Sequence, residues 1–184
     1  EPLELGYSYW NEGRITSFNS VDCGLSGGIP LEIGDLTNLT SLNLSNNLLG
    51  CYEYDFEGGC DYWNQSECCI THCDETDECS GEIPIEISSL ENLTNLSISI
   101  NQLSGEIPQG VWDMIYLENL HLYINELSGE IPESIGNLVN LTSLWLKFNN
   151  FTGYLPQSIG ENLVNLSQLS MSGNDFVGVI PNNI

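Results

Sequence analysis

Disulfide formation is the chemistry that this sequence supports most clearly. Six of the seven cysteines lie between residues 51 and 79 of the 184-residue chain, and the seventh, Cys23, stands apart. The clustered residues are Cys51, Cys60, Cys68, Cys69, Cys73 and Cys79. An even number of closely spaced cysteines in a small acidic chain predicts three disulfides, whose pairing the sequence leaves open. A metal site at Cys69, His72 and Cys73 is disfavoured, because their spacing matches no standard zinc pattern.

Catalytic chemistry has much less support. The chain has two histidines, His72 and His121, and no serine or cysteine nucleophile motif surrounds either of them. A pair formed by His121 with Glu118 or Glu126 is the one acid–base arrangement left open. We therefore predict no enzymatic activity and no cofactor.

The elements that position these residues repeat along the chain. Successive segments read NLTNLSISINQLSGEIP, YLENLHLYINELSGEIP and NLTSLWLKFNNFTGYLP. The first central apolar position of each unit recurs every 24 or 25 residues, except for one step of 54 residues that leaves room for an insert of 30. These positions are Phe18, Leu42, Leu96, Leu120, Leu144 and Leu169. A fixed period of this length predicts a solenoid in which each unit completes the core of its neighbours.

The motif LxxLxLxxNxLSGxIP resembles that of the plant-type extracellular leucine-rich repeat family. The resemblance implies an α/β repeat solenoid, a right-handed superhelix of about six repeats with a parallel β-sheet on its concave face. We expect a degenerate N-terminal cap at residues 1–14 and a solenoid at 15–184, interrupted by the cysteine-rich insert at 51–79. The resemblance also implies a ladder of polar side chains that bond to the backbone of the next repeat. Its positions hold Cys23, Asn47, Asn101, Asn125, Asn149 and Asn174.

A binding surface is predicted on the concave face of the middle repeats. Residues that flank the central leucines should point out of the sheet, since side chains alternate along a strand. Aromatic and apolar residues gather at these positions, together with a lysine, and such exposed clusters mark contact sites. The candidate contact residues are Ile100, His121, Tyr123, Ile124, Trp145, Lys147 and Phe148. The alternative is that some of these rings pack on a neighbouring repeat.

Charge and glycosylation motifs indicate the compartment and the partners. The chain has 26 acidic and 2 basic residues, a net charge of −24, which excludes nucleic acid as a partner and disfavours anionic membranes. No apolar run is long enough to insert in a bilayer. Sequons for N-linked glycans occur at Asn38, Asn43, Asn64, Asn92, Asn95, Asn140, Asn150 and Asn165. Sequons and disulfides together predict an extracellular, secreted or cell-surface glycoprotein.

Two other repeated columns suggest further roles. Glu82, Glu106 and Glu130 recur in phase, and we expect them to be solvated, with bridging by Ca²⁺ as the alternative. Threonines recur at Thr16, Thr40, Thr94 and Thr142, where ice binding is a minor alternative because most of them belong to sequons.

The missing caps at the two ends of the solenoid lead to two expectations for its function. Neither end carries the cysteine-pair cap that the resemblance implies, and uncapped repeats are a template for stacking. Our first expectation is a structural scaffold whose copies stack end to end into a glycan-coated filament. The alternative is a fragment of a longer ectodomain that binds a protein, peptide or glycan ligand on the concave face, as a receptor or inhibitor does.

Overall fold

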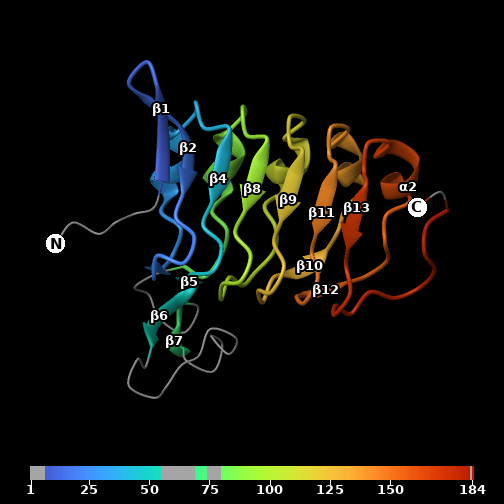
Figure 1. Ribbon diagram of the computed structural model, residues 1–184. Coiled ribbons are helices and arrows are strands. Elements are labelled where there is room, and N and C mark those ends of the chain that lie inside the picture. The colour runs from blue at the N-terminus through green and yellow to red at the C-terminus, as the bar shows by residue number, and fades with distance from the viewer. Residues whose placement is uncertain (1–6, 55–68, 74–79, 183) are drawn as a thin grey trace.

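The repeats stack side by side in one elongated solenoid (Figure 1). A computed structural model describes residues 7–54, 69–73, 80–182 and 184. Its main sheet has seven strands in the order β1-β2-β4-β8-β9-β11-β13. These are β1 (Tyr7–Asn11), β2 (Arg14–Asn19), β4 (Ser41–Asn43), β8 (Asn95–Ser97), β9 (Asn119–His121), β11 (Ser143–Trp145) and β13 (Gln168–Ser170).

The predicted register of the repeats is confirmed strand by strand. From β2 onward neighbouring strands are parallel, and Phe18 pairs with Leu42, which pairs with Leu96. The series continues through Leu120 and Leu144 to Leu169. Because β4 pairs directly with β8 across the step of 54 residues, the insert leaves the sheet uninterrupted.

Short helices and small sheets form the rest of each repeat. The helices are η1 (Leu31–Asp35), η3 (Ile85–Ser89), η4 (Gln109–Asp113), η5 (Glu133–Asn137) and α2 (Ser158–Asn162). A 3₁₀-helix of one or two turns fits here because Pro30, Pro84, Pro108 and Pro132 each precede a helix and fix its entry. Parallel pairs join β3 (Ser26–Gly27) to β5 (Leu48–Leu49), and β10 (Ser128–Glu130) to β12 (Asn150–Thr152).

Both irregular parts of the chain contribute a hairpin. Strand β1 pairs antiparallel with β2 at the N-terminal edge, inside the region expected to be a cap. In the insert, β6 (Cys51–Tyr54) pairs antiparallel with β7 (Cys69–His72). Cys51 and Cys73 are both buried and disulfide-bonded, and Cys23 is free. The predicted disulfide residues Cys60, Cys68 and Cys79 lie outside the described residues, as does the side chain of Cys69.

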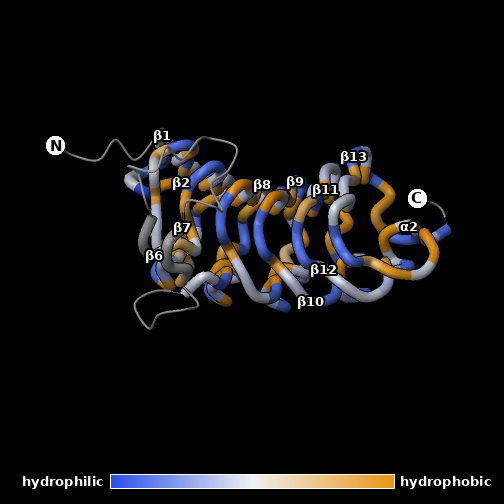
Figure 2. Tube along the Cα trace, turned by 90° about the horizontal axis from the view of Figure 1, so that it is seen from below, coloured by the Kyte–Doolittle hydropathy of each residue, from blue (hydrophilic) through white to orange (hydrophobic). Residues whose placement is uncertain are grey.

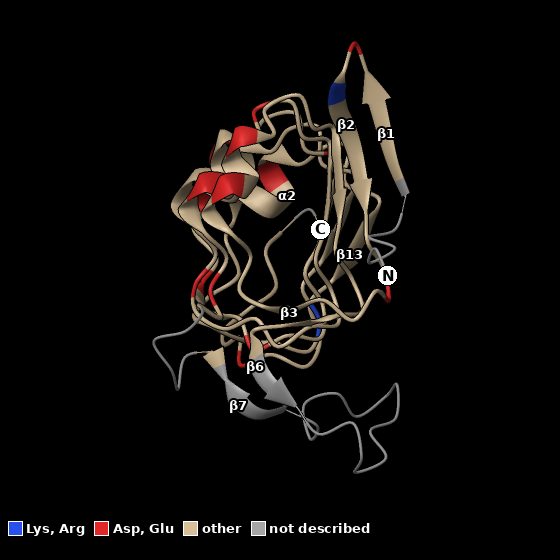
Figure 3. Ribbon diagram, turned by 90° about the vertical axis from the view of Figure 1, so that its left-hand side faces the viewer, with Lys and Arg blue, Asp and Glu red and all other residues tan. Residues whose placement is uncertain are grey.

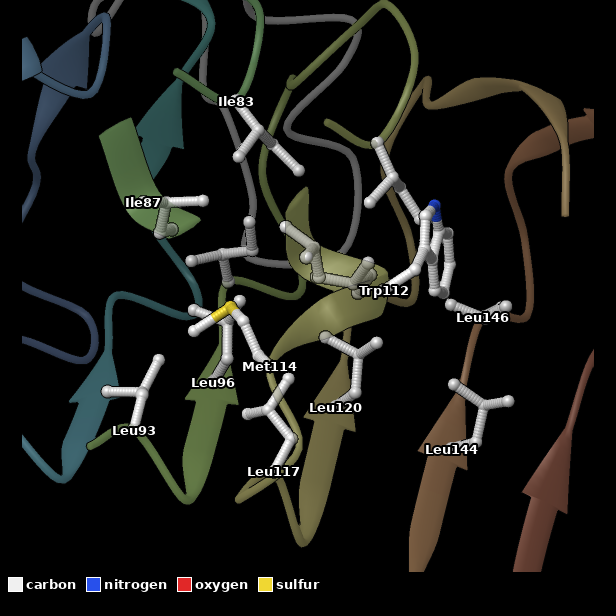
Figure 4. Close-up of a cluster of buried hydrophobic side chains, with 14 of the residues drawn as sticks. Ile83, Ile87, Leu93, Leu96, Trp112, Met114, Leu117, Leu120, Leu144 and Leu146 are labelled. Carbon is white, nitrogen blue, oxygen red and sulfur yellow. The ribbon is translucent and has the colours of Figure 1, made fainter. Parts of the chain in front are cut away.

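The core runs between the main sheet and the helices. Leucines from successive repeats stack in columns, as Leu96, Leu120 and Leu144 do in Figure 4, and all three are buried. Trp112 on η4 enters the same core and is also buried. Figure 2 shows that apolar and polar segments follow one another in a similar order around each turn. Burial of each leucine contributes about 1.5–3 kcal/mol, so every repeat depends on its neighbours for most of its stability.

A ladder of asparagine side chains connects successive repeats of the solenoid by hydrogen bonds. The side-chain oxygen of Asn125 accepts a bond from the Leu103 backbone N–H at 3.1 Å, and its amide nitrogen donates to the Ile98 carbonyl at 3.1 Å. Asn47, Asn101, Asn149 and Asn174 bond in the same way. These partners belong to the preceding repeat, so the expected direction, toward the next repeat, was wrong.

Cys23 occupies the first ladder position but does not act as a ladder residue. Its backbone N–H donates to the side-chain oxygen of Asn47, and its thiol donates to the Val21 carbonyl at 3.4 Å. Among the described residues, strand β2 has the hairpin strand β1 on that side and not a preceding repeat, so no carbonyl of a preceding repeat lies there. An amide is therefore not needed there.

Candidate ligand-binding surface

The middle of the concave sheet carries four residues that contact one another. These are His121 at the end of β9, Trp145 at the end of β11, and Tyr123 and Lys147, each two positions further on; we call them the aromatic patch. Trp145 lies in register with His121 on one side and with Ser170 on the other. The side chains at positions 121, 123, 145 and 147 face out because their buried neighbours Leu122 and Leu146 face the core.

The rings of the aromatic patch are fixed by contact with each other. The His121 and Trp145 rings stack, with centroids 4.3 Å apart and planes inclined by 14°. Tyr123 meets Trp145 edge to face at a centroid distance of 5.7 Å. The Lys147 ammonium lies 5.2 Å from the Tyr123 ring centre and 5.9 Å from that of Phe148. Such contacts restrict the conformations that these large side chains can adopt.

His121 is held by a hydrogen bond as well as by stacking. Its Nε2 lies 2.8 Å from the Ser143 hydroxyl, and Ser143 is buried. Burial lowers the pKa of His121 below its ordinary value, so the ring is neutral at neutral pH. In the described part of the chain, no hydrogen bond links His121 to Glu118 or Glu126. The acid–base pair that the sequence left open therefore does not form in this structure.

Three further predicted contact residues border the aromatic patch. Ile100, Ile124 and Phe148 follow one another in successive repeats; Ile124 is 40% exposed and Phe148 is 54% exposed. Ile100 is half-buried. The seven predicted contact residues thus lie on three neighbouring repeats, at the ends of β9 and β11 and in the segments that follow β8, β9 and β11. Asn46 and Ser99, which are equivalent to Ile124 and Tyr123 in other repeats, are instead buried, and their backbones bond to the adjacent repeats.

Acidic residues are missing from the strands at this surface. As the structure bounds them, β4, β8, β9, β11 and β13 contain no Asp or Glu, and the acids lie mainly on the helical side and in the turns (Figure 3). Arg14 and Lys147 are the two basic residues of the sequence. Within the described residues the Lys147 ammonium forms no salt bridge, and it lies over the rings of Tyr123 and Phe148. The aromatic patch is therefore a neutral to slightly positive area on a strongly acidic protein.

The sequon asparagines have structural roles of their own. The amide nitrogens of Asn92, Asn140 and Asn165 each donate to a carbonyl of the preceding repeat at 2.8–2.9 Å. Asn43, Asn95 and Asn150 bond locally or to the preceding repeat, Asn38 is half-buried, and Asn64 lies outside the described residues. An amide that carries a glycan keeps one N–H, so these bonds are compatible with glycosylation.

The threonine and glutamate columns are also tied to the repeats. Thr40 and Thr94 donate their hydroxyls to backbone carbonyls of the preceding repeat at 3.0 Å. Glu82, Glu106 and Glu130 are exposed, and each side chain lies across a glycine of the following repeat. Over the described ranges, no group of three or more His, Cys, Asp or Glu residues is arranged to hold a metal ion. No helix in those ranges is both long and apolar enough to cross a membrane.

Sequence reasoning missed two features of this surface. The first is the hydrogen bond between Ser143 and His121. Its only signal in the sequence is that residue 143 pairs with residue 119, two positions before His121, on the neighbouring strand. The second is the left-handed backbone of Ile100, Ile124 and Phe148, with φ of 57°, 55° and 55°. Their place before the ladder asparagine, where Asn46 and Gly173 also have positive φ, could have revealed it.

The solved structures that are similar to this one include plant receptor ectodomains. A structure of PEPR1 with AtPEP1 matches 96% of this chain and 21% of its own length, at 33% identity and a TM-score of 0.75. The ectodomain of the receptor kinase SOBIR1 from Arabidopsis thaliana matches 89% of this chain and 72% of its own, at 29% identity and a TM-score of 0.68. The Arabidopsis receptor kinase HAESA, in complex with the peptide hormone IDA and the co-receptor SERK1, matches 85% of this chain and 21% of its own length, at 34% identity and a TM-score of 0.63.

The chain spans about a fifth of PEPR1 and of HAESA. No curated protein matches the sequence. The family model described as Leucine Rich Repeat matches residues 38–58, 92–114, 116–138, 140–162 and 165–184, which together make up more than half of the chain. The chain therefore belongs to the leucine-rich repeat family.

Proposed function

We propose that this chain is a non-enzymatic ligand-binding module that holds a peptide, or an extended segment of a protein, on its concave face. The observation that carries this proposal is the aromatic patch. It places two stacked rings, a third ring and an unpaired ammonium on the open side of the sheet. Trp and Tyr contribute most binding energy where they become desolvated, and these are half-buried before any ligand binds.

The similar structures support the same class of function. They are ectodomains of receptor kinases, and HAESA is described in complex with a peptide hormone. Together with the disulfide-bonded Cys51 and Cys73, this favours an extracellular or cell-surface location for this chain. N-linked glycans at the sequons fit that location and are part of the proposal.

End-to-end stacking into a filament, our first expectation from the sequence, has less support. The similar structures are receptors and receptor complexes, and the feature that stands out in the fold is a surface patch on the middle repeats. Filament formation stays a prediction, which sedimentation of the purified protein would test.

Affinity selection from a mixture of random synthetic peptides with free termini tests the proposed function. The bound peptides are identified by mass spectrometry, and their affinities are measured for the wild type, Trp145→Ala and Tyr154→Ala. Tyr154 is 73% exposed and lies outside the concave face, so it controls for loss of an aromatic ring. Because a central aromatic contact contributes about 2 kcal/mol or more, Trp145→Ala should weaken binding about 30-fold.

The control variant should bind as the wild type does. Peptides that bind Trp145→Ala as well as the wild type, with both variants folded by circular dichroism, would show that the ligand site lies elsewhere.

A further inference from the structure

Three neighbouring repeats place large apolar residues where the backbone disfavours them. Ile100, Ile124 and Phe148 have φ between 55° and 57°, in the left-handed region. Side chains branched at Cβ are genuine outliers there, since the Cβ approaches the backbone too closely. We call these three residues the apolar strip.

The fold itself requires the left-handed conformation at this position. Each residue of the apolar strip directly precedes a ladder asparagine, and the equivalent residues of other repeats also have positive φ. Those equivalents are Asp22, Asn46 and Gly173. Gly, Asn and Asp are the residue types that adopt this conformation most readily. The apolar strip therefore replaces residues that suit the turn with residues that strain it.

Core packing does not account for this choice. Ile124 is 40% exposed, Phe148 is 54% exposed and Ile100 is half-buried, so none of the three is enclosed in the interior. The Phe148 ring lies over Gly173 of the next repeat, where an added Cβ would collide with it. Strained residues with exposed side chains are typical of sites that contact a partner.

We propose that the apolar strip and Lys147 form one docking site for an extended peptide that crosses the repeats. Apolar side chains of the peptide pack on Ile100, Ile124 and Phe148, and a carboxylate of the peptide pairs with the Lys147 ammonium. The inference rests on the proposed function and adds the chemistry of the ligand to it.

Charge and spacing select this occupant. Lys147 has no anionic partner in the described residues, and the adjacent strands carry no acids. A single carboxylate is therefore attracted here, whereas the net charge of the chain, −24, opposes its approach in general. Neighbouring strands are about 4.8 Å apart, so the apolar strip is about 10 Å long. An extended peptide rises about 3.3 Å per residue, and two side chains on one face are about 6.6 Å apart. Two apolar side chains at alternate peptide positions therefore fit along the strip.

The peptides selected on the wild type test this site through binding. We expect them to carry apolar residues at alternate positions and a nearby carboxylate, and we expect Ile124→Asn and Phe148→Asn each to weaken binding about tenfold or more. Val164→Asn is the matched control, because Val164 is an exposed apolar residue on another face, and it should bind as the wild type does.

A double-mutant cycle tests the carboxylate. Lys147→Gln should weaken binding, and neutralising the peptide carboxylate should have no further effect on this variant. Amidation of the peptide C-terminus and Asp→Asn or Glu→Gln changes in the peptide are made separately, so that the two sources of the carboxylate are distinguished.

A measurement without ligand tests the strain. Ile124→Asn and Ile124→Ala both remove the apolar side chain, but only Asn suits the left-handed turn, so Ile124→Asn should have the higher melting temperature. An equal or lower melting temperature for Ile124→Asn would refute the strain argument.

The binding results separate the two proposals. Peptides whose binding is weakened by Trp145→Ala but unaffected by Ile124→Asn and Phe148→Asn would overturn the docking site and leave the proposed function intact. Peptides whose binding is unaffected by Trp145→Ala, Ile124→Asn and Phe148→Asn alike would overturn both.

Discussion

Removal of one ladder amide should destabilise the solenoid far more than removal of its exposed neighbour. The Asn149 side chain accepts a bond from the Leu127 backbone N–H at 3.0 Å and donates to the carbonyls of Leu122 at 2.9 Å and Leu146 at 3.1 Å. Asn149 is buried, so no water replaces these partners in Asn149→Ala. Three bonds at about 1 kcal/mol each give a loss of about 3 kcal/mol in the free energy of unfolding.

Urea unfolding followed by circular dichroism measures this loss, with the slope of the transition used to check that the denatured state is unchanged. Asn150→Ala is the control, because Asn150 is exposed and makes one longer bond, 3.2 Å, to the Glu126 carbonyl. Its unfolding free energy should change by about 0.5 kcal/mol or less. Equal losses in the two variants would refute the reasoning that the ladder holds adjacent repeats together.

Two predictions concern pH. Burial lowers the pKa of His121, so the unfolded chain binds this proton first and stability should fall as pH drops below about 6.5; unfolding of wild type and His121→Gln across this range measures the difference, and identical profiles would contradict it. The backbone N–H of Ser158 and then other bonds from Ser158 and Gln157 lower the pKa of Glu133, which is exposed. Its contribution is present above the ordinary carboxyl pKa and is lost as pH falls through the lowered value. The unfolding free energy of Glu133→Gln should not show this loss when the pH is lowered. An acid transition equal to that of the wild type would show that the bonds from Gln157 and Ser158 to Glu133 do not stabilise the contact between their repeats.

The repeat period predicted most of the fold because it encodes the register directly. Leucines 24 residues apart must lie one above another if each repeat is to bury its apolar edge, and the strand pairs show this. The direction of the asparagine ladder could not be predicted in this way. An asparagine side chain can bond to the backbone of either neighbouring repeat. The choice depends on which repeat directs its backbone N–H groups toward the side chain, as the N–H of Leu103 does toward Asn125.

The candidate site was predictable in position but not in geometry. Alternation along a strand placed His121 and Trp145 on the same face, since both precede a buried leucine. Their stacking, the bond to Ser143 and the burial of Ser99 depend on side-chain conformations that a sequence pattern does not carry. The strain at Ile124 likewise arises from the turn and not from the residue type.

A crystal structure of the protein with a peptide selected from the synthetic mixture tests the central claim most directly. We predict that the peptide crosses strands β8, β9 and β11 on the concave face, in contact with Trp145 and Ile124 and with a carboxylate beside Lys147. A peptide bound on the helical side or along the turns, with Trp145 left exposed to solvent, would contradict the account.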